Sequence, residues 1–338
     1  MDTHGRMDRT IPPATGQRPP TGPPATGRRL GWEQIPGWLR AEVEARLGGP
    51  VAEAVTQPTG FSPGLAVRVR LANGRRAFVK AVGPEPNPDS PGAHRSEARV
   101  MAALPRSAPA PRLLWSLDRS GWVSLAFEDV DGAHPTLPWR PDELGRVLAM
   151  VADLARALTP APAGMPQIAD RLEDAFVGWR RLAAAHAAGD DDLAALDPWT
   201  VRHLDRLADL EAGWPRAAEG PTLLHADLRA DNLLLTPTRV VAVDWPWACV
   251  GAAWVDLLLL LPSVAMQGGP DPEATFAAHP VAAAADPRAV TTALAAWAGY
   301  LVFGSRQPPP PGLPTLRAFQ LGQGVVALDW LRRRTGWS

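Results

Sequence analysis

Alternating hydrophobic and polar residues near the start of the chain predict an antiparallel sheet. The dipeptide Asn73-Gly74 separates two alternating segments, and Asn-Gly is the strongest short-range signal for a β-hairpin. Other hydrophobic segments of strand length, bounded by turn residues, extend the pattern. The expected strands cover residues 51–55, 66–71, 77–82, 112–115 and 122–127. An α-helix over residues 93–104 is expected between the third and fourth strands.

Helices are expected on both sides of this region. A hydrophobic stripe over residues 35–47 indicates a short amphipathic helix before the first strand. From Asp142 onward the pattern is mostly helical, except that residues 233–235 and 239–243 read as a second hairpin. The chain therefore belongs to the α+β class, with a sheet in its first part and mostly helices in its second.

The composition divides the chain into three parts. Residues 1–30 are rich in proline, glycine, threonine and arginine and cannot bury enough apolar surface to become ordered, so we expect a disordered tail. The remaining length is sufficient for two lobes. The N-terminal lobe is expected over residues 31–128 and the C-terminal lobe over residues 129–338.

The charge balance gives no reason to expect a nucleic-acid or membrane partner. A formal net charge of -1 creates no global field that attracts phosphate backbones or anionic lipid. The leucine run at residues 257–261 is far shorter than the roughly 20 apolar residues that span a bilayer. The single cysteine, Cys249, excludes an intrachain disulfide, and the start of the chain lacks the apolar core of a secretory signal. We therefore expect a cytoplasmic protein.

Lysine is almost missing from the composition. The chain has 34 lysine and arginine residues, and Lys80 is its single lysine. Arginine can replace lysine wherever a surface charge suffices, but not where a compact ammonium group is required. Lys80 is therefore a candidate functional residue. The alternative is a lysine left by compositional drift, and the context of Lys80 in the sequence must decide between the two.

A spacing typical of catalytic loops follows in the second half of the chain. His225, Asp227 and Asn232 form the pattern His-x-Asp-x-x-x-x-Asn, and Asp244 comes at the end of the second hairpin. With 7 histidines in 338 residues and asparagine rarer still, chance seldom supplies this pattern. The alternative is that these residues only stabilise turns and cap a strand.

These side chains fit the chemistry of phosphoryl transfer, in which the protein positions the reactants and neutralises charge. Asp227 would orient the acceptor hydroxyl and take its proton. Asn232 and Asp244 would each supply an oxygen ligand to Mg²⁺. Lys80 ends a strand and would reach the phosphates, steadied by Glu97 on the next helix. For Lys80 and Glu97 the alternative is an ordinary solvated surface position.

The same residues resemble the protein-kinase signature set and, more closely, the aminoglycoside phosphotransferase and choline-kinase-like family. The segment Leu-His-Ala-Asp-Leu-Arg-Ala-Asp-Asn-Leu-Leu, followed by Val-Asp-Trp, carries the resemblance, which covers roughly residues 33–335. It implies a two-lobed protein-kinase-like fold with an ATP-binding N-terminal lobe and a catalytic, acceptor-binding C-terminal lobe. It also implies ATP and Mg²⁺ as cofactors and a small-molecule acceptor as partner.

The resemblance adds further candidate residues. The segment that contains Phe127 and Asp129 is similar to the family's hinge between the lobes, where backbone groups hold adenine. Gly60 and Gly64 bound the loop that corresponds to the family's phosphate-contacting loop, although it is only loosely glycine-rich. Pro246 stands where relatives often carry an acidic residue, so the chain lacks at this position the carboxylate that could give a second metal contact.

Several neighbouring residues have competing interpretations. Arg229 could touch the transferred phosphoryl group, and a surface role is equally compatible with its position. His225 is expected to buttress the loop by hydrogen bonding rather than to transfer protons, and Asp256 to bind backbone groups of the loop. Trp245 and Trp247 are expected in the core rather than in a stacking pocket.

We therefore expect an ATP-dependent phosphotransferase that moves the γ-phosphoryl group to a hydroxyl of a small molecule. The acceptor would be an aminoglycoside-like antibiotic, an amino alcohol or a related metabolite. One alternative is a nucleotide-binding pseudokinase with a regulatory or scaffolding role. Another keeps the fold but transfers a nucleotidyl group.

Overall fold

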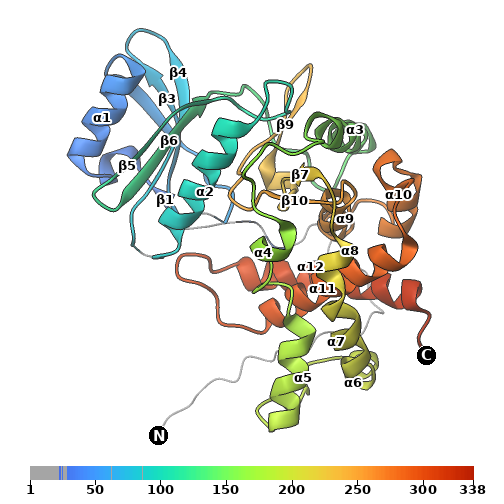
Figure 1. Ribbon diagram of the computed structural model, residues 1–338. Coiled ribbons are helices and arrows are strands. Elements are labelled where there is room, and N and C mark those ends of the chain that lie inside the picture. The colour runs from blue at the N-terminus through green and yellow to red at the C-terminus, as the bar shows by residue number, and fades with distance from the viewer. Residues whose placement is uncertain (1–22, 24, 26–28, 62, 86) are drawn as a thin grey trace, which may run out of the picture.

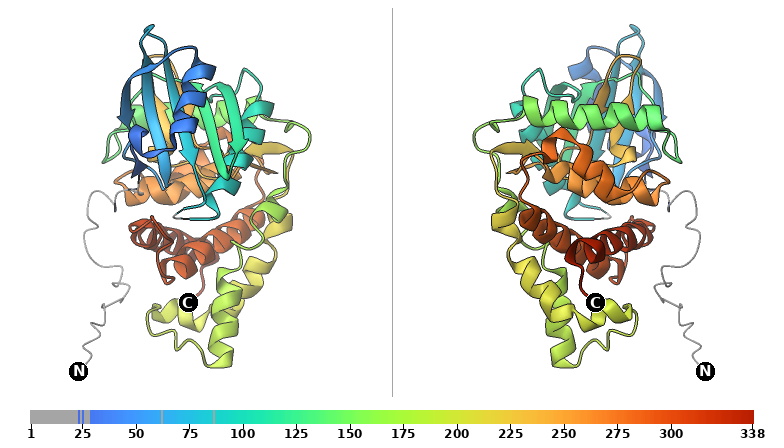
Figure 2. Two further views of the ribbon diagram at one scale, coloured as in Figure 1. Left: turned by 90° about the vertical axis from the view of Figure 1, so that its left-hand side faces the viewer. Right: turned by 90° about the vertical axis from the view of Figure 1, so that its right-hand side faces the viewer.

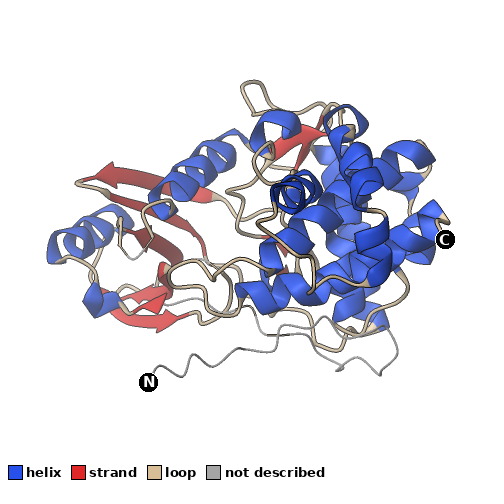
Figure 3. Cartoon of the chain, turned by 90° about the horizontal axis from the view of Figure 1, so that it is seen from below, coloured by secondary structure: helices blue, strands red, loops and turns tan. Residues whose placement is uncertain are grey.

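The computed structural model describes residues 23, 25, 29–61, 63–85 and 87–338, so nearly all of the predicted tail lies outside the described residues. A sheet with helices α1 and α2 forms one lobe, and most other helices gather in a second lobe (Figure 1). In the side views the sheet lobe lies above α11 and α12, with α5, α6 and α7 at the far end (Figure 2). Strands thus concentrate on one side and helices on the other (Figure 3), which confirms the predicted α+β class.

The described part of the first lobe contains a six-stranded sheet of order β1-β3-β4-β6-β5, with β2 also paired to β3. The predicted hairpin joins β3 to β4, and its Gly74 has a φ of +83°, which glycine adopts without strain. All pairs are antiparallel except β1 with β3, which is parallel. The strands are β1 (Arg29–Leu30), β2 (Val51–Thr56), β3 (Gly64–Leu71), β4 (Arg76–Val82), β5 (Leu113–Arg119) and β6 (Trp122–Glu128).

The two faces of this sheet pack against different helices because successive side chains of a strand point to opposite faces. Ala126 of β6 packs in the same cluster as Leu39 and Val43 of α1 (Gly37–Leu47), which follows the 3-10 turn η1 (Trp32–Gln34). Leu125 belongs instead to the main core. The helix α2 (Ser90–Ala103) packs against β4, β5 and β6, and this packing directs one face of α2 toward β4.

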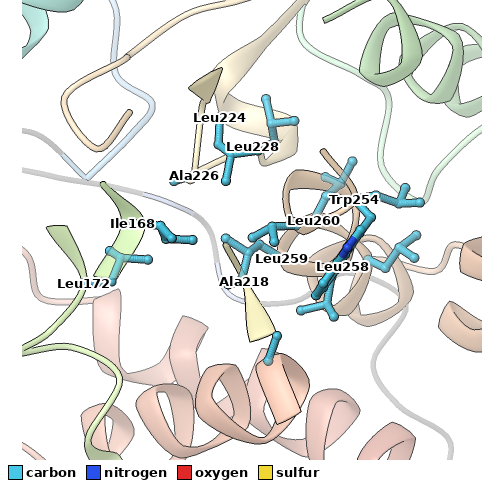
Figure 4. Packing of buried hydrophobic residues seen from close by; sticks show 14 of the residues in the cluster. Ile168, Leu172, Ala218, Leu224, Ala226, Leu228, Trp254, Leu258, Leu259 and Leu260 are labelled. Atoms are coloured by element: carbon cyan, nitrogen blue, oxygen red, sulfur yellow. The ribbon is translucent and has the colours of Figure 1, made fainter. Parts of the chain in front are cut away.

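The second lobe is built around buried helices, and α9 carries the leucine run at its centre. Leu258, Leu259 and Leu260 lie with Leu224, Leu228 and Ile168 in a cluster of buried hydrophobic residues (Figure 4). The run is thus part of the core, and no helix among the described residues is both long and apolar enough to cross a membrane. The helices are α3 (Pro141–Ala157), α4 (Ile168–Arg171), α5 (Gly178–Ala188), α6 (Pro198–Arg202), α7 (Leu204–Ala212), α8 (Trp214–Ala217), α9 (Val255–Met266), α10 (Pro272–Ala278), η3 (Pro280–Ala282), α11 (Pro287–Ser305) and α12 (Leu316–Thr335).

Short strands interrupt the helical lobe at the predicted place. Strands β8 and β9 pair with Leu233 opposite Ala242, and β7 pairs with β10. Between β7 and β8 lies the loop with the His-x-Asp-x-x-x-x-Asn spacing, which we call the catalytic loop, residues 225–232. The elements are β7 (Thr222–Leu224), η2 (Ala230–Asn232), β8 (Leu233–Leu235), β9 (Val240–Ala242) and β10 (Cys249–Gly251).

Some expected boundaries and placements differ from the structure. The fourth predicted strand continues to Arg119, because its polar residues occupy exposed positions of an edge strand. Residues Arg29 and Leu30, at the end of the predicted tail, form β1. Trp245 is buried as expected, but the expectation for Trp247 was wrong: it is 45% exposed, and the guanidinium of Arg171 stacks on its ring at 4.9 Å.

Candidate active site

A cavity of about 380 Å³ is lined by residues of both lobes. Most of the residues predicted from the sequence meet there. The predicted residues that line it are Gly60, Lys80, Glu97, Phe127, Asp129, Asn232 and Asp244. Asp227 and Arg229 line a smaller neighbouring cavity of about 50 Å³. The catalytic loop therefore lies between two cavities.

Lys80 is held by carboxylates from both lobes. Its ammonium donates to Oε1 and Oε2 of Glu97 at 2.8 and 3.0 Å and to Oδ1 of Asp244 at 2.7 Å. These contacts depend on the packing of α2 against β4, which brings Glu97 over the strand that carries Lys80. The expectation of a helical carboxylate beside the single lysine is thus met in geometry.

Electrostatics within this cluster follow from burial and pairing. Burial alone would lower the pKa of Lys80, but Asp244 and Glu97 raise it, so the ammonium stays charged. Burial alone would raise the pKa of Asp244, but Lys80 lowers it well below its usual range. For Glu97 burial prevails and raises the pKa. Asp244 is therefore the more firmly ionised of the two carboxylates.

The carboxylate of Asp256 fixes the backbone of the catalytic loop. It accepts hydrogen bonds from the backbone N–H groups of His225 at 2.9 Å and Ala226 at 2.7 Å. Ala226 has a φ of +61°, a left-handed conformation that costs energy for a residue with a Cβ. The two bonds to Asp256 offset this cost and hold the turn that presents Asp227. The role expected for Asp256 agrees with these contacts.

The side chain of His225 links two backbone segments of the site. Burial lowers its pKa to about 4, so the imidazole is neutral near pH 7. Its Nδ1 accepts a hydrogen bond from the backbone N–H of Asp227 at 3.2 Å, so the proton of the neutral ring is on Nε2. Nε2 in turn donates to the carbonyl oxygen of Val243 at 3.0 Å. The ring thereby joins the catalytic loop to the residue that precedes Asp244.

Asp227 is oriented by two neighbours. The amide nitrogen of Asn232 donates to the backbone oxygen of Asp227 at 2.8 Å and to its Oδ2 at 3.2 Å. Arg229 donates to Oδ1 of Asp227 and, at 3.0 Å, to both carboxylate oxygens of Asp231. Burial raises the pKa of Asp227 to about 6, although Arg229 opposes this change. The Arg229 side chain is only 12% exposed, which contradicts the surface role that its position also allowed.

The donor atoms that remain on Asn232 and Asp244 suit a hard cation. The amide nitrogen of Asn232 serves Asp227, so its carbonyl oxygen is the atom that can face a metal. Asp244 gives Oδ1 to Lys80, which leaves Oδ2 for the same purpose. No group of three or more histidine, cysteine, aspartate or glutamate side chains among the described residues could hold a metal ion alone. Mg²⁺ would need phosphate oxygens to complete its ligands, as is usual for this ion.

The two glycines of the predicted phosphate loop lie in different surroundings. Gly60 lines the large cavity, with a φ of +94°. Gly64 begins β3 and is not among the residues that line it. A Cβ on Gly64 would stand 2.7 Å from the carbonyl oxygen of Ala81, so the close approach of β3 and β4 requires glycine at this position. We expected Gly64 to contact the nucleotide, whereas the structure gives it a packing role.

The predicted hinge residues are both at the large cavity. Phe127 lines it, and the ammonium of Lys80 lies 6.0 Å from the centre of its ring. The carboxylate of Asp129 binds Arg68 at 2.6 Å and Arg76 at 2.7 Å. The Asp129 side chain thus ties the hinge to the sheet, and its backbone is the part that can serve a ligand.

Sequence reasoning missed several residues of the site. Arg29 lines the large cavity, although its segment was assigned to the tail. Phe61, Tyr300 and Phe319 line the small cavity beside Asp227, and the rings of Phe61 and Phe319 meet edge to face at 5.2 Å. These residues come from distant parts of the chain, and no local motif marks them. The arginine-rich composition also hid Arg29 among many similar residues.

Comparisons with known proteins identify the family and the fold. Residues 58–297 match the model of the phosphotransferase enzyme family, APH. No curated protein sequence matches the chain significantly. Aminoglycoside phosphotransferase APH(4)-Ia, solved with AMP-PNP and hygromycin B, is 15% identical with a TM-score of 0.57, over 88% of this chain and 99% of that chain.

Two other solved structures show a similar fold. Choline kinase LicA from Streptococcus pneumoniae is 15% identical with a TM-score of 0.56, over 87% of this chain and 98% of that chain. Amicoumacin kinase hAmiN, solved with AMP-PNP and Ca²⁺, is 11% identical with a TM-score of 0.54, over 87% of this chain and 94% of that chain. At such identities the likeness establishes the fold, and the two-lobed kinase-like prediction is confirmed.

Proposed function

The chain belongs to the phosphotransferase enzyme family and is a small-molecule phosphotransferase, and on this premise we propose that it uses ATP and Mg²⁺. The γ-phosphoryl group would pass to a hydroxyl of an aminoglycoside-like antibiotic, an amino alcohol or a related metabolite. The observation that carries the proposal is the meeting of Lys80, Asn232 and Asp244 in one cavity, with Asp227 at the adjoining one. The comparisons give no support to the pseudokinase alternative.

Each residue has a role that its position supports. Lys80 would bind phosphate oxygens, and Glu97 would keep its ammonium in place. Asn232 and Asp244 would hold Mg²⁺, which supplies positive charge to the transferred phosphoryl group. Asp227 would accept the proton of the acceptor hydroxyl, because it is the carboxylate that faces the small cavity. A relative solved with AMP-PNP supports a nucleotide in the large cavity.

The acceptor side has a distinctive lining. Aromatic rings and the amides of Gln320 and Gln323 surround the small cavity, and its charged groups are Asp227 and Arg229. The proposed acceptor thus enters beside Phe61 and Phe319. Our proposal for the compartment is the cytoplasm, where ATP is available, and the single cysteine, Cys249, is buried as a free thiol.

The substitution Asp227→Ala tests the proposal. We expect phosphoryl transfer to fall by about 10²–10⁴-fold, since this is the usual contribution of a positioned general base, while ATP binding persists. The assay is ADP release in a screen of aminoglycosides, macrolides, amino alcohols and sugars, with mass spectrometry of the product. Added phosphoryl mass supports the proposal, and added nucleotidyl mass contradicts it.

A matched control is Asp205→Ala on α7, where the aspartate is exposed and remote from the cavity linings. It should leave both ATP binding and transfer unchanged. Undiminished turnover of a true acceptor by Asp227→Ala would refute the assignment of the base.

A further inference from the structure

Two described positions of the loop from Thr59 to Gly64 have no backbone donor to offer a phosphate. The backbone N–H of Gly60 donates to the carbonyl oxygen of Ala25 at 3.0 Å, and Pro63 has no N–H. Glycine-rich phosphate loops normally rely on such N–H groups. Positive charge from another part of the site would therefore strengthen the binding of a polyphosphate at this loop.

Arg29 stands at the place where that charge is needed. It lines the large cavity together with Lys80 and Asp244. Its Nη2 donates to the carbonyl oxygen of Thr59, and a Cβ built on Gly60 would lie 3.0 Å from the same nitrogen. The guanidinium therefore lies directly beside the phosphate loop, at the cavity.

The backbone explains how a residue so early in the chain reaches the cavity. Arg29 pairs with Gly64 in the parallel ladder between β1 and β3, which sets β1 along the start of the strand that follows the phosphate loop. This ladder makes the position of Arg29 a feature of the sheet rather than of a loose terminus.

On the basis of the proposed function, we propose that Arg29 is a nucleotide-binding residue that contacts the phosphates of ATP and complements Lys80. Arginine suits this task because its planar fork matches phosphate geometry. Burial lowers the pKa of Arg29, whereas Asp244 and Asp231 oppose the decrease, so the cation is partly desolvated beside acidic groups. A desolvated cation attracts phosphate more strongly than a hydrated one.

The test compares the affinities for ATP and for adenosine, measured by titration calorimetry in the presence of Mg²⁺. We expect Arg29→Gln to weaken ATP binding by about 10–100-fold, the value of a charge-assisted hydrogen bond, and to leave adenosine binding unchanged. Arg29→Lys keeps the charge but not the fork, so it should weaken ATP binding by a smaller factor. Arg70→Gln is the matched control, because Arg70 is exposed and pairs with Glu53 outside the cavity.

The outcomes separate a phosphate contact from a structural role. Equal weakening of ATP and adenosine would mean that Arg29 only anchors the loop through Thr59, and the proposal fails. ATP affinity within about twofold of the parent protein in Arg29→Gln also overturns it. If Arg29→Gln does not fold, as judged by its melting curve, the ATP-to-adenosine ratio of Arg29→Lys decides. A parent protein that binds no ATP refutes the proposed function as well, whereas normal parental binding with an unaffected variant refutes Arg29 alone.

Discussion

The three contacts of Lys80 allow its charge and its shape to be tested separately. Lys80→Met removes the charge, and Lys80→Arg keeps the charge but changes the shape. The ammonium meets three carboxylate oxygens at 2.7 to 3.0 Å, two on Glu97 and one on Asp244, and the residue is only 9% exposed. A compact group with three donors fits this arrangement, whereas a planar fork does not.

The expected magnitudes differ between the two variants. Lys80→Met leaves Glu97 and Asp244 buried without their cation, and such a loss costs about 3–5 kcal/mol of unfolding free energy. Lys80→Arg retains the charge and should lose about 1–3 kcal/mol through overpacking. Both should lose at least about 10²-fold in kcat/KM for ATP, the scale seen when one oriented electrostatic group is removed.

Urea unfolding measures the loss of unfolding free energy, and ADP release with an accepted substrate measures the loss of kcat/KM. The double variant Lys80→Met/Glu97→Gln should recover part of the lost stability, because it removes an uncompensated carboxylate, but no activity. Near-parental turnover in Lys80→Arg would refute the reasoning and return the single lysine to compositional coincidence. If the double variant lost more unfolding free energy than the two single variants lose together, the account of the buried charge would be refuted.

Two further predictions concern the catalytic loop. The pKa of Asp227 is raised to about 6, and the base must be ionised, so kcat/KM for the acceptor should fall as pH decreases through about 6. A profile that stays flat down to about pH 5 would contradict this assignment. Asp256→Ala leaves two N–H groups of the catalytic loop without their acceptor. We therefore expect the unfolding free energy to decrease by about 2–4 kcal/mol and kcat to fall by more than about tenfold. Chemical denaturation and steady-state kinetics measure both, and an unchanged kcat would show that Asp256 does not position the base.

Local patterns predicted the parts of the fold that depend on local interactions. The hairpin at Asn73-Gly74 formed because the turn residues and the alternation agree. The spacing from Asp227 to Asn232 was informative for the same reason, since both lie on one loop. The contact of Lys80 with Glu97 required only that the next helix pack on the sheet, which α+β folds commonly do.

The remaining features depend on contacts between distant segments. The packing role of Gly64 exists only because Ala81, which pairs with the neighbouring Leu65, brings its carbonyl oxygen close to Gly64. Arg29 reaches the cavity through a parallel pairing of two residues on each side, which no propensity signals. Phe61 and Phe319 meet across about three quarters of the chain, and their contact could be found only in the folded structure.

The presence of one lysine makes the protein a natural single-site reporter. Amine-reactive reagents modify many positions on most proteins, but here they have one side-chain target, Lys80, besides the terminal amine. Its ammonium stays charged and is held by Glu97 and Asp244, so we expect it to resist these reagents, and labelling at this residue would report that those contacts have opened. The same scarcity warns against attaching the protein to a surface through amines, because such coupling would fall on the terminus or the site itself.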